Sequence, residues 1–447
     1  MGIQLKTFRM GGIHPKAEKI TAGKGIVSLP IPGEVWIPLS QHIGAPAKAL
    51  VAKGDKVVVG QRIAESGGFV SANIHSSVSG TVLKVDNVVD ASGFAKPAIV
   101  IKVEGDEWDS SIDRTETVVR ENSMSAKEIL ARIVEMGIVG MGGATFPTHV
   151  KLSVPEGKKV EYLLLNGVEC EPYLTSDHRL MLERGEQILV GASILRRALG
   201  NPRTVIAIEN NKRDALAHLG ALAKEFEGIE VQALKVKYPQ GGEKQLIEAV
   251  TGREVPSGKL PLDVGAVVDN VGTVYAIYEA LQKHKPLIER VVTATGKGLR
   301  APGNFMVRIG TPIHVLLEAA GGLPADTGKV ISGGPMMGRA LKNVSAPVTK
   351  GTSGVLVMPE SESDRGESSN CIRCAQCAHH CPMGLEPYLL IRLSRMGDCE
   401  RLEHEEVMSC IECGSCSFTC PANIPLLDYI RMGKSATGAM IRARSQK

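Results

Sequence analysis

Two cysteine runs near the end of the chain constrain its fold more than any other feature. The spacing Cys-x-x-Cys-x-x-Cys-x-x-x-Cys-Pro occurs at residues 371–382 and again at residues 410–421. Three thiolates separated by two residues can surround one face of an iron–sulfur cube. The fourth lies too far along the chain, and in paired runs it ligates the other cluster. The spacing therefore predicts two [4Fe–4S] clusters with exchanged fourth ligands.

The predicted ligand sets follow from this exchange. One cluster is assigned to Cys371, Cys374, Cys377 and Cys420, and the other to Cys410, Cys413, Cys416 and Cys381. Two zinc knuckles are the alternative, but zinc sites usually combine two separated pairs of ligands rather than one run of four. Disulfides are less favoured still, since no other feature indicates secretion. Electron transfer is the predicted chemistry.

Composition and length bound the remaining possibilities. The 447 residues are enough for three or four domains. Charged residues make up 22% and the net charge is +4, which predicts no nucleic-acid partner. No stretch approaches the roughly 18 uninterrupted apolar residues that span a bilayer, and the start of the chain lacks the apolar run of a secretion signal. We expect a protein without a transmembrane segment of its own, in the cytoplasm or at the cytoplasmic face of a membrane.

The first 115 residues are predicted to be rich in β-strands. Short β-branched runs at residues 27–29, 34–39, 56–59, 79–85 and 98–103 are separated by Gly, Pro, Asn and Asp. The pattern of residues 51–64 and 74–82 resembles a biotinyl/lipoyl-like barrel sandwich. That fold normally presents a lysine at a hairpin tip, but Gly67-Gly68-Phe69-Val70 occupies the comparable region here. We therefore interpret the sandwich as a docking module.

Residues 116–295 alternate between helical and strand patterns. Ser125 and Glu128 have the spacing of a capping box before a helix. Apolar strands are predicted at 162–165, 204–208 and 229–236, and helices at 178–199 and 214–226. This alternation predicts a mostly parallel sheet with helices on both faces, and ligands bind at the carboxyl ends of such strands.

The third and fourth parts of the chain differ from this pattern. Residues 296–358 predict a compact β-rich domain around one helix at 313–320, and residues 360–369 resemble a polar linker. The basic tail after Pro421 is expected to be a frayed, solvated end. The predicted architecture is therefore a multidomain α/β protein with parts at 1–115, 116–295, 296–358 and 359–447.

A glycine-rich stretch precedes the predicted sheet. Residues 140–151 read Gly-Met-Gly-Gly-Ala-Thr-Phe-Pro-Thr-His-Val-Lys, so backbone N–H groups can approach an anionic or planar ligand and Lys151 can supply positive charge. The stretch matches neither the P-loop nor the dinucleotide fingerprint. Two strand-end segments, at residues 166–172 and 238–244, add carboxylates and further glycines.

Together these segments resemble the flavin- and NADH-binding subunit of respiratory complex I and its relatives in NAD-linked hydrogenases. That family carries Gly-x-Gly-Gly-Ala-x-Phe-Pro-Thr-x-x-Lys, Asn-x-x-Glu-x-Glu-Pro, a Gly-Glu-Glu after a tyrosine and an Asn-Val-x-Thr turn. Here Met141 replaces a usual arginine and Gly242 replaces the first of two glutamates. The likeness covers roughly residues 120–345 and implies a soluble-ligand-binding β-grasp (SLBB) domain after a Rossmann-like domain. With the sandwich and the doubled cysteine run, the whole chain resembles the RnfC family of the Rnf ion-translocating electron-transport complex.

The resemblance implies roles for individual residues. It places Glu169 and Glu171 beside the flavin ring as catalytic carboxylates. It places Phe146 on the NADH side as a stacking surface and Glu243 against the ribose or the amide of NADH. Non-covalent FMN would be held by Gly140, Gly142, Lys151, Asn166, Asn270 and Thr273.

The resulting hypothesis is a peripheral electron-input subunit of a membrane-bound, ion-translocating complex. NADH would pass hydride to FMN, and FMN would pass single electrons to the two clusters and on to other subunits, among them a ferredoxin-like cluster subunit. Two alternatives stay open on the sequence. One is a non-catalytic electron wire or docking scaffold. The other is the flavin subunit of a soluble NAD-linked hydrogenase or formate dehydrogenase.

Overall fold

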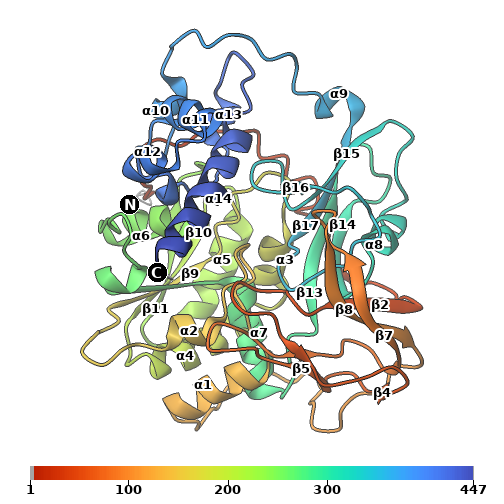
Figure 1. Cartoon of the computed structure of the whole chain (residues 1–447). Coiled ribbons are helices and arrows are strands. Elements are labelled where there is room, and N and C mark those ends of the chain that lie inside the picture. The colour runs from red at the N-terminus through yellow and green to blue at the C-terminus, as the bar shows by residue number, and fades with distance from the viewer. Residues whose placement is uncertain (1–4, 446–447) are drawn as a thin grey trace.

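The computed structural model describes residues 5–445. Figure 1 shows four regions: a small sandwich at the lower right, a parallel sheet with its helices on the left, a larger mixed sheet on the right, and a group of short helices at the top left. A long irregular connection over the top, residues 364–375, joins the mixed sheet to the short helices. The predicted division at residues 115, 295 and 358 stays a prediction.

The N-terminal sandwich consists of two small sheets around an apolar core that includes Val35, Ile63 and Ile99. One sheet has the order β2-β8-β7-β4 and the other has the order β3-β5-β6. The strands are β2 (Glu34–Pro38), β3 (Lys48–Ala49), β4 (Lys56–Val57), β5 (Arg62–Glu65), β6 (Ile74–His75), β7 (Gly80–Val89) and β8 (Ala95–Val103).

The α/β region is built on four parallel strands in the order β11-β10-β9-β12. Both faces are apolar: Leu163, Leu165 and Ile206 belong to one core, and Leu164 and Val205 to another. Such strands are buried on both sides and therefore read as continuous apolar runs. The elements are α1 (Ala126–Glu135), α2 (Thr148–Leu152), β9 (Tyr162–Asn166), α3 (Ser176–Glu183), α4 (Gly185–Ala198), β10 (Arg203–Glu209), α5 (Arg213–Leu222), η1 (Ala223–Glu225), β11 (Ile229–Leu234), α6 (Glu243–Thr251), η2 (Pro261–Val264), β12 (Ala266–Asn270) and α7 (Val271–Gln282).

The mixed sheet has six strands in the order β1-β14-β13-β17-β15-β16. It draws on distant parts of the sequence, because β1 pairs in parallel with β14 and places Val27 opposite Phe305. Helix α8 packs on this sheet through Ile313, Leu316 and Leu317. The elements are β1 (Ile26–Ser28), β13 (Glu289–Thr295), β14 (Gly303–Arg308), α8 (Ile313–Ala319), β15 (Thr327–Ser332), β16 (Arg339–Ala340), β17 (Gly354–Pro359) and α9 (Glu360–Ser363).

The cluster domain contains both cysteine runs and is helical. Its core includes Leu390, Leu402 and Ile430. The elements are α10 (Gln376–His379), α11 (Pro387–Met396), α12 (Cys399–His404), η3 (Val407–Ser409), α13 (Ser415–Phe418) and α14 (Leu426–Ser445). The start of the chain also reaches this domain, because Gly12 N donates to His380 O at 3.0 Å. The next residue, Ile13, bridges to Tyr238 of the α/β region.

Two sequence expectations on secondary structure were wrong. The helix expected at 178–199 is two helices, because Arg184 lies between α3 and α4 with φ −133° and ψ 29°. The tail expected to be frayed forms the 20-residue helix α14, whose Leu426, Leu427 and Ile430 are buried. The capping box of α1 is confirmed, since Ser125 accepts from Glu128 N and Glu128 accepts from Ser125 N.

Candidate functional site

The carboxyl edge of the parallel sheet has a switch point between β9 and β12. The chain proceeds from β9 outward to β10 and β11, and then returns to place β12 on the other side of β9. Ligands bind at such reversals in open α/β sheets. Asn166 and Asn270 end the two strands at the same register. Asn166 Nδ2 donates to Gly241 O at 2.8 Å, and Asn270 Oδ1 caps α7 by accepting from Gly272 N and Thr273 N.

The glycine-rich loop lies over this switch point. Met141 N donates to the buried Thr273 Oγ1 at 2.9 Å, and Gly140 N donates to Phe146 O at 2.9 Å. Gly142 packs so closely on Asn270 that an added Cβ would lie 3.2 Å from Asn270 Cβ. Gly142 is nevertheless exposed on its other side, and Phe146 is half-buried. The loop therefore presents bare backbone at the strand ends.

Two carboxylates accompany Lys151 at the rim. Lys151 Nζ donates to Val268 O at 2.7 Å and to Glu243 Oε1 at 3.1 Å. Asp269 is only 2% exposed, and both of its carboxylate oxygens lack a hydrogen-bond partner among residues 5–445. Burial raises the pKa of Asp269 to about 6, although Lys151 opposes this shift. A buried carboxylate without a partner is costly, so this edge contains unused hydrogen-bonding capacity.

The two glutamates predicted to be catalytic are held by backbone amides. Glu169 has φ 43° and accepts from Asp177 N at 2.8 Å and from His178 N at 3.2 Å, which caps α3. Glu171 Oε1 accepts from Met336 N at 2.7 Å and from Met337 N at 2.9 Å. Burial raises the pKa of Glu171 although these amides lower it. Both carboxylates thus fix neighbouring segments, and their catalytic role stays a prediction.

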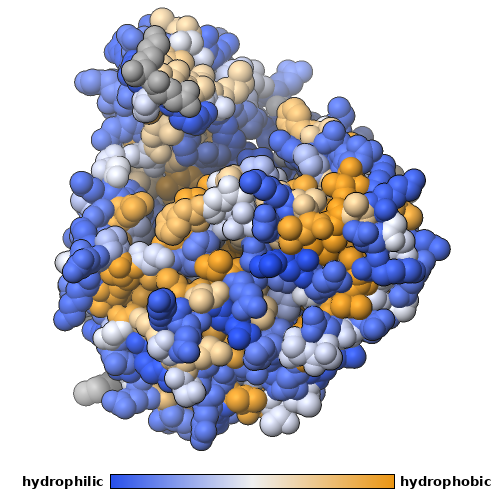
Figure 2. Space-filling view, turned by 60° about the horizontal axis from the view of Figure 1, so that its bottom comes forward, coloured by the Kyte–Doolittle hydropathy of each residue, from blue (hydrophilic) through white to orange (hydrophobic). Residues whose placement is uncertain are grey.

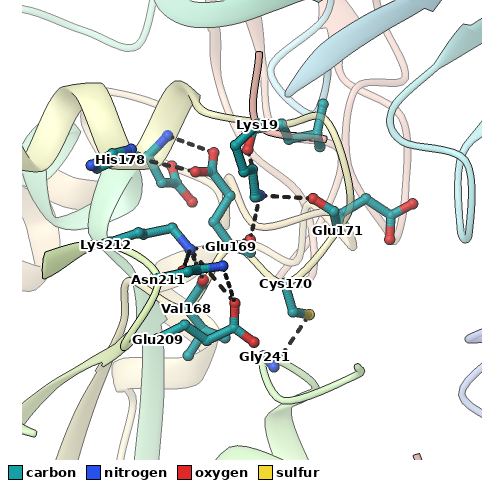
Figure 3. Close-up of polar contacts among 12 residues, drawn as sticks. Lys19, Val168, Glu169, Cys170, Glu171, His178, Glu209, Asn211, Lys212 and Gly241 are labelled. Carbon is teal, nitrogen blue, oxygen red and sulfur yellow. Dashed lines mark hydrogen bonds and ion pairs between the residues drawn. The ribbon is translucent and has the colours of Figure 1, made fainter. Parts of the chain in front are cut away.

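A network of charged side chains behind Glu169 was not found from the sequence. Figure 3 shows Lys19 pointing into the loop that carries Glu169 and Glu171. Its Nζ donates to Glu169 O, Glu171 O and Leu174 O at 2.8, 2.9 and 2.6 Å. Burial, and then Lys212, lower the pKa of Lys19 to about 8. No local pattern distinguishes Lys19, because its partners lie about 150 residues away.

Lys212 completes this network from the end of β10. Its Nζ donates to Val168 O at 2.7 Å and lies 3.6 Å from Glu209 Oε2, and both side chains are 2% exposed. Burial raises the pKa of Glu209, whereas Lys212 and Lys19 lower it. Cys170 points to Gly241, whose N lies 3.4 Å from the sulfur (Figure 3). Buried charges of opposite sign therefore fill the edge between β9 and β10.

In the cluster domain, four cysteines line one cavity. Cys381 of the first run meets Cys410, Cys413 and Cys416 of the second, and the rest of the lining is largely apolar. This is one predicted ligand set, and four thiols within an apolar shell fit a [4Fe–4S] cluster. Within residues 5–445, no three potential ligand side chains converge on a point that a single metal ion could occupy. The ligand assignment itself stays a prediction.

The other predicted set is more open to solvent. Cys371 and Cys374 are exposed, whereas Cys377 and Cys420 are half-buried and pack against the core of the cluster domain. Burial, and then the neighbouring Cys420, raise the pKa of Cys377 despite opposing backbone hydrogen bonds. The two sets thus differ in exposure although their sequence spacing is identical.

The cysteine-lined cavity adjoins the α/β region. The Tyr238 hydroxyl donates to Cys413 O at 2.9 Å. Ile13, Tyr238 and Cys413 form a small apolar cluster against which Cys170 and Met336 pack. Met336 is in turn held by Glu171. The wall of the cavity is therefore in contact with the loops that follow β9 and β11.

Four family profiles match successive parts of the chain. Residues 6–106 match the RnfC barrel sandwich hybrid domain, and residues 133–279 match the Nuo51 FMN-binding domain. Residues 291–340 match the SLBB domain, and residues 370–425 match the 4Fe–4S dicluster domain. The order of these matches confirms the predicted fold class.

Curated relatives decide the family. The C subunit of the proton-translocating ferredoxin:NAD(+) oxidoreductase complex from Clostridium ljungdahlii is 49% identical over 86% of this chain and 84% of its own length. The C subunit of the Na(+)-translocating complex from Acetobacterium woodii is 43% identical over 91% of this chain and 92% of its own length. The chain belongs to the RnfC family. A further relative, the C subunit of an ion-translocating oxidoreductase complex from Rhodobacter capsulatus, is 41% identical over 99% of this chain and 85% of its own length.

Solved structures agree on the fold of this RnfC family member. The chain is similar to a chain of an NAD+-reducing [NiFe]-hydrogenase in the H2-reduced state, with a TM-score of 0.52 and 20% identity over 70% of this chain and 63% of that one. At this identity the likeness concerns the fold alone. In the described part of the chain, no helix combines the length and the apolar character of a membrane span. The family is a component of oxidoreductase complexes, as predicted.

Proposed function

We propose that this subunit takes up electrons from NADH through FMN at the switch point and passes them to two [4Fe–4S] clusters. The single observation that carries the proposal is the cysteine-lined cavity, whose wall contacts the loops at the carboxyl edge of the sheet. An electron donor bound at that edge would therefore have a short path of packed side chains to the nearer cluster. Electron flow in the opposite direction uses the same path.

The residues at the switch point fit FMN. Gly142 presents exposed backbone, Lys151 supplies a cation, and Asp269 has two oxygens that no described residue engages. These groups can bind a phosphate, hydroxyls and a polar ring. Asn270 and Thr273 hold the loop in place. When bound, FMN supplies the conversion between two-electron hydride chemistry and single-electron steps.

The chain's part in the NADH reaction is orientation. Hydride transfer needs the donor and acceptor atoms within roughly 3–3.5 Å of each other. Phe146 can support the nicotinamide by stacking, and Glu243 can accept from a ribose hydroxyl or the amide. Met141 and Gly242 leave this pocket less charged and roomier than the complex I pattern. Glu169 and Glu171 keep their proposed place beside the ring through the loop they anchor.

The order of the clusters follows from their surroundings. The set Cys381, Cys410, Cys413 and Cys416 contacts the α/β region and would exchange electrons with the flavin. The set Cys371, Cys374, Cys377 and Cys420 includes two exposed cysteines and would face the next carrier. A ferredoxin-like cluster subunit is the partner that this arrangement fits, because single-electron transfer needs a second cluster brought close to the exposed one.

Membrane association would be peripheral, at the cytoplasmic face and through other subunits of the complex. Exposed apolar side chains on the N-terminal sandwich include Ile43, Leu50, Phe69 and Phe94. Figure 2 shows hydrophobic residues gathered on the right side of the molecule. Figure 1 places the sandwich on the same side. Exposed apolar surface of this kind can mark interaction sites, which supports the proposed docking role.

The test uses protein purified without oxygen and loaded with iron, sulfide and FMN. We expect bound FMN, iron for two clusters, bleaching of the flavin absorbance on addition of NADH, and the appearance of paramagnetic signals from reduced clusters. Flavin bleaching without any cluster signal would overturn the proposed circuit. Reducible clusters with no flavin binding would instead favour the electron wire. An enzyme that is wholly soluble and independent of a membrane complex would favour the hydrogenase or formate dehydrogenase subunit.

A further inference from the structure

The two cysteine loops share a left-handed residue at the same position, but the residues there have opposite charges. Arg373 occupies the position before the second cysteine in the first run, and Glu412 occupies it in the second. Both residues have positive φ, at 58° and 57°. A residue that must adopt this left-handed conformation is uncommon unless it is glycine, asparagine or aspartate. The cation Arg373 and the anion Glu412 therefore occupy equivalent positions in the two turns.

The second loop is held by cations from α14. Arg431 Nε lies 3.0 Å from Glu412 Oε2, and Lys434 Nζ lies 3.1 Å from Glu412 Oε1. Lys434 Nζ also donates to Cys410 O at 2.6 Å. All three side chains are between 23% and 30% exposed. Arg373, by contrast, is exposed at the surface.

The three charged side chains beside the second cysteine loop sum to one positive charge. Two cations and one anion surround the loop, and Lys434 is in direct contact with the backbone of a predicted ligand. Cys413 and Cys416 are buried, so a charge here is less screened than at the exposed first run. The reduction potential of an iron–sulfur cluster depends on net charge, hydrogen bonds to the sulfurs and solvent exposure. Glu412 N, which lies 3.4 Å from Cys410 Sγ, adds such a hydrogen bond.

We propose that Lys434 is a positioning residue that raises the reduction potential of the cluster held by Cys381, Cys410, Cys413 and Cys416, and that Glu412 opposes it. The inference rests on the proposed function, because it concerns that cluster. Reduction adds one electron, and the added negative charge is stabilised by the ammonium of Lys434. Glu412 keeps this charge in place while offsetting part of it. The pair thus sets the potential at which this cluster accepts an electron.

A purely structural clamp would behave differently. Lys434→Met and Glu412→Gln both break the same ion pair, so a clamp predicts similar consequences for the two variants. The electrostatic role predicts opposite signs. Lys434→Met removes a cation and disfavours reduction, whereas Glu412→Gln removes an anion and favours it. Lys434→Arg keeps the charge and should restore the wild-type value.

The experiment is a redox titration of the full-length, cluster-loaded protein under anaerobic conditions, followed by electron paramagnetic resonance. At a fixed potential we expect the ratio of reduced to oxidised cluster to fall about tenfold in Lys434→Met, or about 59 mV for one electron. It should rise by about the same factor in Glu412→Gln. Arg442→Met, which removes an exposed cation from the same helix, is the matched control and should change the ratio by less than about twofold, since exposed charges are screened. Arg373→Met, which removes an exposed cation from the first run, should likewise leave this ratio unchanged within about twofold.

Shifts of the same sign in Lys434→Met and Glu412→Gln, or no shift in Glu412→Gln, would overturn the proposal. Iron content is measured for each variant. If Lys434→Met loses its iron, Glu412→Gln still decides the sign, because Lys434 keeps its contact with Cys410 O in that variant. A wild-type protein that holds iron for fewer than two clusters would overturn the proposed function itself. Two reducible clusters without the opposite shifts would overturn only the role of Lys434.

Discussion

The two halves of the parallel sheet's carboxyl edge are built in opposite ways. Between β9 and β10 the edge is closed by Lys19 and Lys212, which donate to the loop after β9, and by Glu209, which forms an ion pair with Lys212. Between β9 and β12 it is open at Gly142, whose backbone is exposed, and it contains the buried Asp269, whose carboxylate has no hydrogen-bond partner among the described residues. One half pairs its charged groups internally, and the other keeps one buried carboxylate without a hydrogen bond.

This difference separates anchoring from binding on a single sheet. Buried ion pairs fix geometry but give little net stability relative to apolar packing, and removing one partner is strongly destabilising. The open half differs, because the buried Asp269 has no hydrogen-bond partner there among the described residues and makes the ligand-free protein less stable. Substitutions in the closed half should therefore damage the fold, and substitutions in the open half should change flavin binding.

The largest expected effect is in the closed half, at Lys212→Met. Glu209 would be left buried without its nearest cation, and Val168 O would lose its donor. We expect a loss of about 3–5 kcal/mol in the free energy of local unfolding. Hydrogen–deuterium exchange of peptides covering β9 and β10 measures this quantity without requiring the whole chain to unfold at once. The double variant Lys212→Met/Glu209→Gln should recover part of the loss, and equal exchange in single variant and wild type would contradict the anchoring role.

In the open half, Asp269→Asn should increase the stability of the protein, whereas Lys212→Met in the closed half should decrease it. The pKa of Asp269 is about 6, above its ordinary 3.8, so between these values the unfolded state binds fewer protons than the folded state. Stability therefore falls as pH rises through this window, and a change of this size corresponds to about 3 kcal/mol. Asp269→Asn removes the cost and should stabilise the flavin-free protein at pH 7 by up to about 3 kcal/mol.

Exchange rates of β12 peptides at pH 5 and pH 7 check the Asp269 prediction, after correction for the intrinsic pH dependence of exchange. The wild type should lose protection at the higher pH and Asp269→Asn should not. If the variant is less stable than the wild type at both pH values, Asp269 has a partner in solution and the edge is not open there.

Lys151→Met should weaken FMN binding. A charge-assisted hydrogen bond contributes about 1.5–3 kcal/mol, so we expect FMN to bind about 10–100 times more weakly. Quenching of flavin fluorescence during titration gives the dissociation constant. Lys158→Met is the matched control, because Lys158 pairs with Asp263 on the exposed surface of the same region. Equal loss in both variants would indicate a general electrostatic effect instead of a site.

The smallest effect is expected at Glu243→Gln. Its ion pair with Lys151 is 42% exposed on the Glu243 side, and exposed pairs contribute less than about 1 kcal/mol. Thermal stability and FMN affinity should therefore change little, whereas the KM for NADH should rise if Glu243 contacts the nucleotide. An unchanged KM would remove Glu243 from the site while leaving the open edge intact.

Part of this comparison was accessible from the sequence. The residues of the open half lie in short segments of the sequence: the glycines, Lys151 and the strand-end asparagines. The spacing within these segments was enough to predict a ligand-binding loop. The cysteine runs are local in the same way. The structure brings Cys381 to the same cavity as Cys410, Cys413 and Cys416, and the exchanged ligand pairing stays a prediction. Asp269 could have been found as well, since it directly precedes Asn270 at the end of an apolar strand.

The closed half could not be predicted, because its contacts are long-range. Lys19 sits in a segment with no periodicity, and its acceptors are backbone carbonyls, which every residue carries. The break at Arg184 and the packing of α14 were also missed. The helical periodicity continues through Arg184 although the helix does not, and the basic composition of α14 hides a buried apolar stripe.

Residues 11–28 connect three distant parts of the chain. Gly12 bonds to His380, Ile13 pairs with Tyr238, and β1 adds to a strand that begins at Gly303. Gly11 also lies against Cys381, which lines the cysteine-lined cavity. These contacts cannot all form until the polypeptide has been made past Cys381, so this wall of the cavity is completed late in synthesis.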